Sequence, residues 1–270
     1  GGAAFVALTL TIGLGQVPYG QEIIFAGSMA IVVFLMRQLI SVLPEAQARM
    51  LVGTALIIFA FRAVPRPGDG ATWFSIDMLG FDQQFLSVLS LIASVLALVG
   101  MVVLRPLMAN RSITYIIVLL SIVSGLLFLP NIGLYYGVQD WTAAVTFGIV
   151  DARFIALIDT AVESPLGQVA MIPMLAWIAR NAPGHLKATF FAVMASFTNL
   201  ALSASSLLTK YLNQIFTVTR EVTDPETGAV TVAANYGELG WLLIVVMGIT
   251  VGAPLLVVAA VQRTAFRTTD

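Results

Sequence analysis

The chain has 270 residues, of which 59% are hydrophobic and only 10% are charged, and its mean hydropathy is +0.96. This composition is typical of a polytopic membrane protein and excludes an ordinary soluble domain. The net charge of -1 gives no reason to expect a nucleic-acid partner, and the absence of cysteine excludes disulfides, thiolate metal sites and a cysteine nucleophile. With one histidine and no metal- or nucleotide-binding motif, the sequence predicts neither a metal nor a cofactor.

Eight apolar segments are candidates to cross a bilayer, which requires roughly 20 residues each. In chain order they cover residues 2–16, 21–43, 50–80, 84–104, 112–130, 152–180, 186–212 and 239–261. None alternates with the period of two that a membrane β-barrel needs, so the sequence predicts an all-α, polytopic transmembrane helix bundle. The first segment is short, and the chain begins without Met or the charged start of a signal peptide, so we expect an N-terminal part to precede it.

Lysine and arginine are distributed unevenly among the turns that join these segments. Eight of the 13 basic residues fall in alternate turns or in the C-terminal tail, namely Arg37, Arg49, Arg105, Arg111, Arg180, Lys187, Arg263 and Arg267. The positive-inside rule places these turns, and both ends of the chain, in the cytoplasm. The sequence therefore predicts a multi-pass protein of an inner (plasma) membrane, of bacterial type.

Two longer connections lie on the opposite side, at residues 131–151 and 213–238. Both are rich in turn-forming residues, and we expect them to be solvated loops. In the second connection, runs with β-branched residues flank Pro225 and Gly228, which predicts a small hairpin.

The third segment, residues 50–80, is too long for one regular crossing and carries RAVPRPGDG at its centre. Pro65 and Pro67 remove backbone donors and the nearby glycines loosen the backbone, so a regular helix cannot continue. An exposed loop here would require one more crossing before Arg105 and would reverse the charge bias of every later turn. We therefore expect a half-helix over residues 51–64, a break inside the membrane and a second helical piece. Unwound backbone at that depth is tolerated only inside protein or beside a watery cavity, so the break is a candidate binding site.

Asp159 and Glu163 stand one helical turn apart in the sixth segment. Carboxylates at membrane depth are costly, and they usually mark the path of an ion or a substrate. We expect these two acids to couple transport to protons. The alternative is a structural pair with Arg62 or Arg66 in the interior of the bundle.

Other polar side chains are candidates for substrate contact. Arg62 and Arg66 border the expected break, and a guanidinium group suits a carboxylate ligand. Alternatively, the two arginines neutralise nearby acids. Serine and asparagine residues on one face of the seventh segment could contact a solute or could pack against another helix. The full candidate set for substrate binding is Arg62, Arg66, Asp77, Gln168, Ser196, Asn199 and Ser203.

Three short stretches resemble the folate-biopterin transporter family, a branch of the major facilitator superfamily. They are LGF at residues 79–81, Asp159 followed by LGQVAMIP at 166–173, and the run from Ala179 to Ala192. The resemblance covers residues 51–262. One position departs from the family pattern, because Lys187 stands where the family usually has an acid after the proline of an inner turn.

The resemblance implies a major facilitator fold of two six-helix halves. This chain of about 8 helices would then hold helices five and six in residues 1–45 and the complete C-terminal half in residues 46–270. The first two segments lack the family pattern, so they could instead be extra helices between the halves.

The resemblance and the buried acids together imply a secondary active transporter, a symporter that moves an organic solute together with protons. The implied solute is a folate- or pterin-like organic anion, although Lys187 leaves room for a different one. The expected partners are this solute, protons and the lipid bilayer. The alternative is a non-transporting assembly or scaffold protein of a larger membrane complex. An enzyme is not expected, since the sequence offers no converging nucleophile and base.

Overall fold

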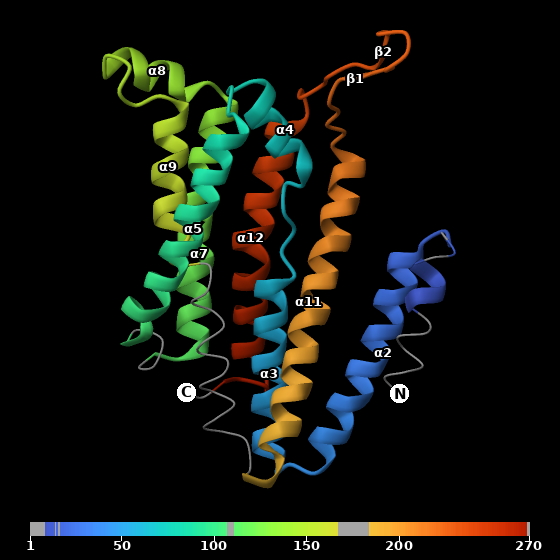
Figure 1. Cartoon of the computed structure of the whole chain (residues 1–270). Helices are drawn as coiled ribbons and strands as arrows, with labels where there is room; N and C mark the ends of the chain where they lie inside the picture. Colours follow the sequence, from blue (N-terminus) through green and yellow to red (C-terminus); the bar gives the residue numbers. More distant parts are fainter. Residues whose placement is uncertain (1–8, 14, 16, 107–110, 167–183, 269–270) are drawn as a thin grey trace.

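The computed structural model describes the chain apart from residues 1–8, 14, 16, 107–110, 167–183 and 269–270 (Figure 1). Within the described part, five helices are long and apolar enough to cross a membrane. They are α2 (Gly20–Ser41), α5 (Gln83–Val103), α7 (Ile113–Tyr135), α11 (Lys187–Ile215) and α12 (Leu239–Gln262). The predicted all-α class of a polytopic membrane bundle is confirmed.

The third expected crossing is interrupted, as its prolines and glycines predict. The third consists of α3 (Glu45–Arg62), a non-helical stretch, and α4 (Asp69–Asp77). The sixth is described as α9 (Ala152–Glu163), and the 3-10 turn η1 (Gly184–Leu186) comes directly before α11. Most of the first expected segment lies outside the described residues, as does the remainder of the sixth, including Gln168.

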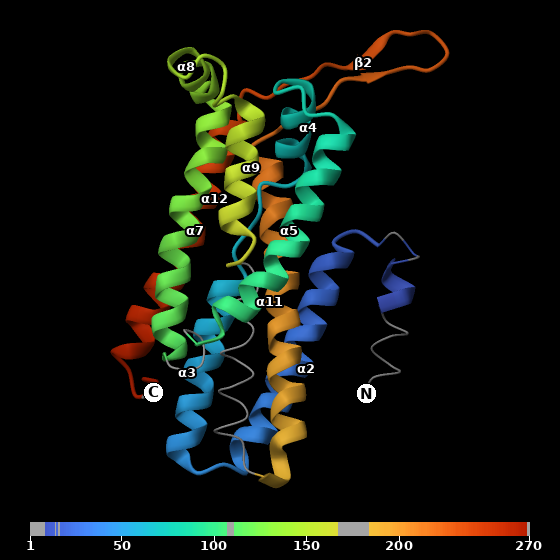
Figure 2. The same cartoon turned by 60° about the vertical axis from the view of Figure 1, so that its left-hand side comes forward.

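The long helices run roughly along one axis, and the chain reverses at two opposite ends (Figures 1 and 2). The turn between α2 and α3, the start of α11 and the end of α12 share one end, which we call the basic end. α4 and the ribbon of β1 (Val222–Thr223) and β2 (Val230–Val232) lie at the other, the outer end. Turns that the charge pattern assigned to one side of the membrane thus lie together.

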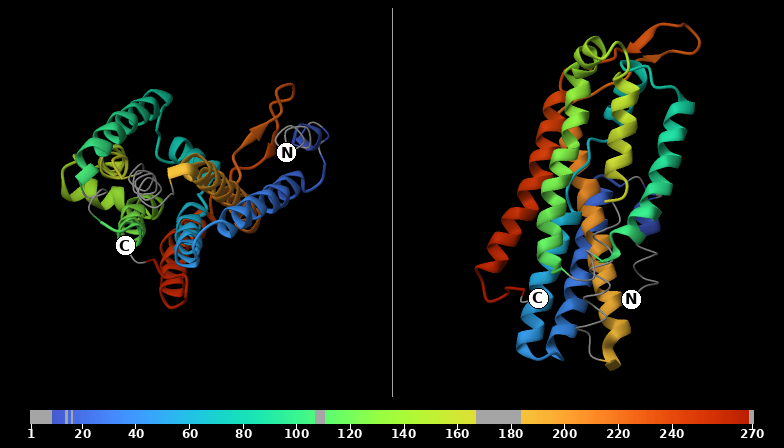
Figure 3. Two further views of the ribbon diagram at one scale, coloured as in Figure 1. Left: turned by 90° about the horizontal axis from the view of Figure 1, so that it is seen from below. Right: turned by 90° about the vertical axis from the view of Figure 1, so that its left-hand side faces the viewer.

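The helices form two groups, which are connected by α12 and by direct packing of α3 against α7. α5, α7 and α9 pack together, whereas α2 and α3 pack with α11, and α12 lies against both α7 and α3 (Figure 3). The largest core cluster lies between α3, α7, α11 and α12, and its fully buried side chains include Leu51, Ile57, Phe190 and Met194. Large apolar side chains such as Leu91 and Val102 are exposed on outer faces of α5, as expected of a helix that meets lipid.

The connection at residues 131–151 corrects one prediction. It is largely helical, because α7 continues to Tyr135 and α8 (Val138–Val145) follows. Gly137 adopts φ 81° and turns the chain between the two helices instead of opening a loop. By contrast, the expected hairpin is present, since β1 and β2 pair antiparallel on either side of Gly228, whose φ is 67°.

Candidate functional site

The unwound segment, residues 63–68, separates α3 from α4 and lies between α11 and α12 in Figures 1 and 2. Within it, Ala63 and Pro65 are buried, while Arg66 is exposed. Gly68 ends the segment with φ 78°, a conformation that favours glycine. The Ala63 N–H still donates to the Phe59 carbonyl of α3, but the backbone groups beyond it lie outside both helices and need other partners at membrane depth.

A row of polar side chains on α11 supplies these partners. Ser205 donates to the Val64 carbonyl at 2.5 Å, and the backbone N–H of Arg66 donates to Thr209 Oγ1 at 2.9 Å. Asn213 Nδ2 then donates to the Pro67 carbonyl at 3.2 Å. We call Ser205, Thr209 and Asn213 the polar row; their spacing of four residues places all three on one face of the helix.

The candidates predicted from the sequence, Ser196, Asn199 and Ser203, lie on a different face of α11. Ser196 and Ser203 donate only to carbonyls of their own helix, at 2.8 Å to Ala192 and 3.3 Å to Asn199, and Asn199 is exposed. The structure therefore does not bring these residues to the unwound segment. The polar row has the same kind of spacing in the same apolar helix, so periodicity alone could not have distinguished the two faces.

Asp159 is half-buried on α9 and has one polar partner among the described residues. Asn131 Nδ2, in α7, donates to Asp159 Oδ2 at 2.9 Å, whereas Oδ1 is buried without a hydrogen bond. Asp159 is one of the residues that line an open, almost entirely apolar pocket of about 230 Å³, together with Leu127 and Phe154. No cation neutralises this acid within the part of the chain that the structure describes.

Glu163 lies one turn further along α9, where it interacts electrostatically with Asp159 and with Arg66. Arg66 in turn interacts with Arg62, whose Nε atom is buried without a hydrogen bond. Neither arginine forms a direct ion pair with a described residue. Arg62 and Arg66 thus lie at the helix break, and Arg66 interacts with Glu163 from α9 without a direct ion pair.

Asp77, a predicted substrate contact, is hydrogen-bonded to two side chains near the ribbon. At the end of α4 it accepts two hydrogen bonds from Arg220, at 2.8 and 3.0 Å, and one from the Tyr236 hydroxyl at 2.5 Å. Arg220, and after it Tyr236, hold the pKa of this carboxyl below its usual range. Desolvation and the bond to Asp77 raise the pKa of Tyr236 to about 12, so the phenol stays a donor at neutral pH. These contacts fasten α4 to the chain on either side of the ribbon.

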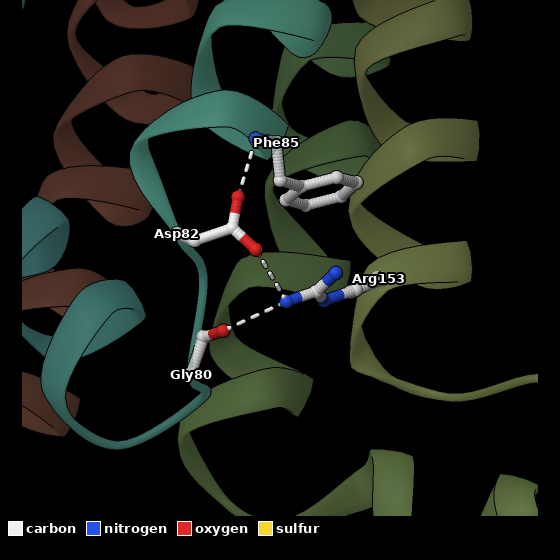
Figure 4. A network of polar contacts seen from close by, with 4 residues as sticks. All are labelled: Gly80, Asp82, Phe85 and Arg153. Atoms are coloured by element: carbon white, nitrogen blue, oxygen red, sulfur yellow. Dashed lines mark hydrogen bonds and ion pairs between the residues drawn. The ribbon is translucent and has the colours of Figure 1, made fainter.

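The outer end of α9 is fastened to α5 (Figure 4). Asp82 caps α5 by accepting from the Phe85 N–H at 2.7 Å, which with Arg153 lowers the pKa of the carboxyl. Arg153, in α9, donates to Asp82 Oδ2 at 2.9 Å and to the Gly80 carbonyl at 3.1 Å, and its guanidinium lies over the Phe85 ring. These contacts of Arg153 help to fix α9, the helix that carries Asp159.

α5 and α9 also pack closely together nearer the basic end. At Gly100 of α5, an added Cβ would collide with the backbone of Pro165, just after α9. Only a glycine allows so close a packing here. α9 is therefore held against α5 near both ends of its described length.

A further ion pair joins α2 to α11 and was not predicted. Glu22 Oε1 accepts from Lys210 Nζ and from the Tyr211 hydroxyl, both at 2.7 Å. Glu22 and Lys210 lie in segments far apart in the chain, so the sequence alone did not indicate the contact.

A family model described as the BT1 family matches residues 20–267. The chain belongs to the BT1 family. This confirms the resemblance to folate-biopterin transporters. The match also corrects one expectation, because it begins at residue 20 and so includes α2, which the sequence analysis had left outside the family pattern.

Three relatives of this BT1 family member carry transporter names. The folate-biopterin transporter of Synechocystis sp. is 30% identical over 161 residues, 58% of this chain and 31% of the relative. The putative folate transporter 2 of Plasmodium berghei is 25% identical over 68% of this chain and 40% of its own length. The folate transporter 2 of Plasmodium falciparum is 22% identical over 62% and 35%. The chain thus spans 31–40% of these relatives. No solved structure matches it.

Proposed function

We propose that this chain is the C-terminal part of a secondary transporter that carries a folate- or pterin-like organic anion together with protons. The observation that carries the proposal is the helix break, where Arg66 interacts electrostatically with Glu163 and with Arg62, and where neither arginine forms a direct ion pair with a described residue. A break of this kind inside a bundle is a common way to build a solute site in membrane transporters.

The two arginines favour an anionic solute. A guanidinium group binds a carboxylate through two parallel hydrogen bonds, and the Arg62 Nε atom is buried without a partner. Three relatives are named as transporters of folate or of folate and biopterin, and folate joins a planar pterin ring to a flexible tail with carboxylate groups. The exposed Asn199 and Ser203 offer further polar contacts for the edges of such a ring, if their face of α11 borders the solute path.

The acids on α9 favour proton coupling. Asp159 has a neutral partner on one oxygen and none on the other, so it can bind and release a proton without breaking an ion pair. Glu163 interacts with both Asp159 and Arg66, and through it the protonation of one group can influence the binding of an anion at the other. In this proposal the basic end faces the cytoplasm of a bacterial cell, and the membrane is the inner membrane.

Ligand-dependent thermal stability tests the solute class. The purified full-length protein would be heated with folic acid, a pterin, other organic anions, neutral sugars and organic cations. A solute that binds only the folded state at 100 times its Kd should add about 2.7 kcal/mol to the free energy of unfolding. We expect the melting temperature to rise with folate or pterin-like anions. A rise with sugars or cations and none with any anion would contradict the arginine-based site.

A further inference from the structure

The unwound segment is fixed on both sides of Arg66 by the polar row of α11. The Val64 carbonyl is held by Ser205, the Arg66 N–H by Thr209, and the Pro67 carbonyl by Asn213. Three successive contacts along one helix face therefore fix the position of the Arg66 backbone. The prolines on either side of Arg66 restrict the same stretch further, since each has a fixed φ angle.

The burial pattern determines the direction of the Arg66 side chain. Pro65 is buried against the bundle, whereas Arg66 is exposed. Because α11 holds the backbone on both sides of Arg66, the exposed guanidinium lies away from the buried Pro65. Arg66 also interacts electrostatically with Glu163 and with Arg62.

Thr209 makes the central contact of the row. Its hydroxyl donates to the Ser205 carbonyl of its own helix at 2.8 Å and accepts from the Arg66 N–H at 2.9 Å. The first bond uses the hydroxyl proton and leaves a lone pair for the second. Valine has nearly the same shape but no hydroxyl, and it would leave the Arg66 backbone N–H without this acceptor.

We infer that Thr209, with Ser205 and Asn213 on either side, is a positioning residue that holds Arg66 where it binds the anionic solute. This inference rests on the proposed function, because it assumes that Arg66 contacts the solute. Its specific claim is that the polar row acts on solute affinity through Arg66, and not only on the stability of the fold.

A double-mutant cycle on the full-length protein in proteoliposomes separates these roles. Labelled-folate uptake would give KM and the maximal rate for Thr209→Val, Arg66→Gln and the double variant. Losing one backbone hydrogen bond should raise KM about fivefold for Thr209→Val, with little change in the maximal rate. Thr209→Ser, which keeps the hydroxyl, should restore KM. In the Arg66→Gln background, Thr209→Val should raise KM no further.

The control is Ser94→Ala, because Ser94 is exposed on α5 and its hydroxyl bonds only to the Ser90 carbonyl of its own helix. It should leave KM unchanged. The inference is overturned if Thr209→Val raises KM equally in the wild-type and in the Arg66→Gln background, or does not raise KM at all. Either result leaves the arginine site standing. If Arg66→Gln itself leaves KM unchanged, both the site and the inference fail. If Thr209→Val does not fold, Asn213→Ala takes its place: it must raise KM in the wild-type background and raise it no further in the Arg66→Gln background.

Discussion

Replacing Asp159 with Asn is expected to reduce folate uptake driven by a pH gradient to the level of protein-free liposomes, while solute exchange without a gradient continues. Asparagine has nearly the same shape and can still accept the hydrogen bond that Asn131 donates at 2.9 Å, but it cannot bind a proton at neutral pH. Loss of pH-driven uptake with retained exchange would therefore reflect loss of the proton carrier. Uptake into proteoliposomes, with and without an imposed pH gradient, measures both quantities.

Two further variants test whether the effect on pH-driven uptake is specific to the buried acids of α9. Glu163→Gln should also impair pH-driven uptake, because Glu163 interacts with both Asp159 and Arg66. Asp151→Asn is the matched control: Asp151 is an exposed acid of the same helix that caps its N-terminus by accepting from the Phe154 N–H at 2.8 Å. Asparagine is an equally good cap, so this variant should behave like the wild type. Unchanged pH-driven uptake in both Asp159→Asn and Glu163→Gln would refute the coupling role of the acids.

Arg66→Gln is expected to weaken solute binding roughly tenfold to hundredfold, the range that corresponds to one lost charge-assisted hydrogen bond or a bidentate pair. Arg66→Lys should recover only part of the affinity, because an ammonium group cannot form the two parallel bonds of a guanidinium. Arg62→Gln should weaken binding as well, since its buried Nε atom has no hydrogen bond in the described part of the chain. Ligand-dependent melting curves at several folate concentrations give the affinities.

The control for the arginines is Arg49→Gln. Arg49 lies near the start of α3 at the basic end and pairs with Glu45 within the same helix. Removing it changes the net charge by the same amount as Arg66→Gln, so a general electrostatic effect would appear in both variants. Equal affinities for Arg66→Gln and Arg49→Gln would show that Arg66 does not contact the solute.

The helix break and the hairpin were predictable because their causes are local. Pro65 and Pro67 cannot continue a helix wherever the segment lies, and the turn residues around Gly228 favour a hairpin in any surroundings. The long apolar helices follow from the same kind of local argument, since each must satisfy its own backbone within the membrane. Gly137 shows the limit of this reasoning, because a glycine can end a helix without opening a long loop.

The partners of the polar groups were not predictable, because they come from distant parts of the chain. Asp77 pairs with Arg220, which lies 143 residues away, and Asp159 is held by Asn131 from another helix. Likewise, helical periodicity groups Ser196 with Ser203 and, on another face, Ser205 with Thr209. It does not indicate which face meets the unwound segment. That choice is made by packing of α11 against α3 and the break, which a single sequence does not reveal.

Counterflow of labelled folate tests transport itself most directly. The full-length protein would be reconstituted into vesicles loaded with unlabelled folate and diluted into a trace of labelled folate, without a pH gradient. A transporter should accumulate label transiently inside these vesicles, above the level in vesicles without internal folate, and the same should hold for pterins if they share the site. Label no higher than in protein-free vesicles, for folate, pterins and the other organic anions alike, would contradict transport and favour an assembly or scaffold protein built on the same helix bundle.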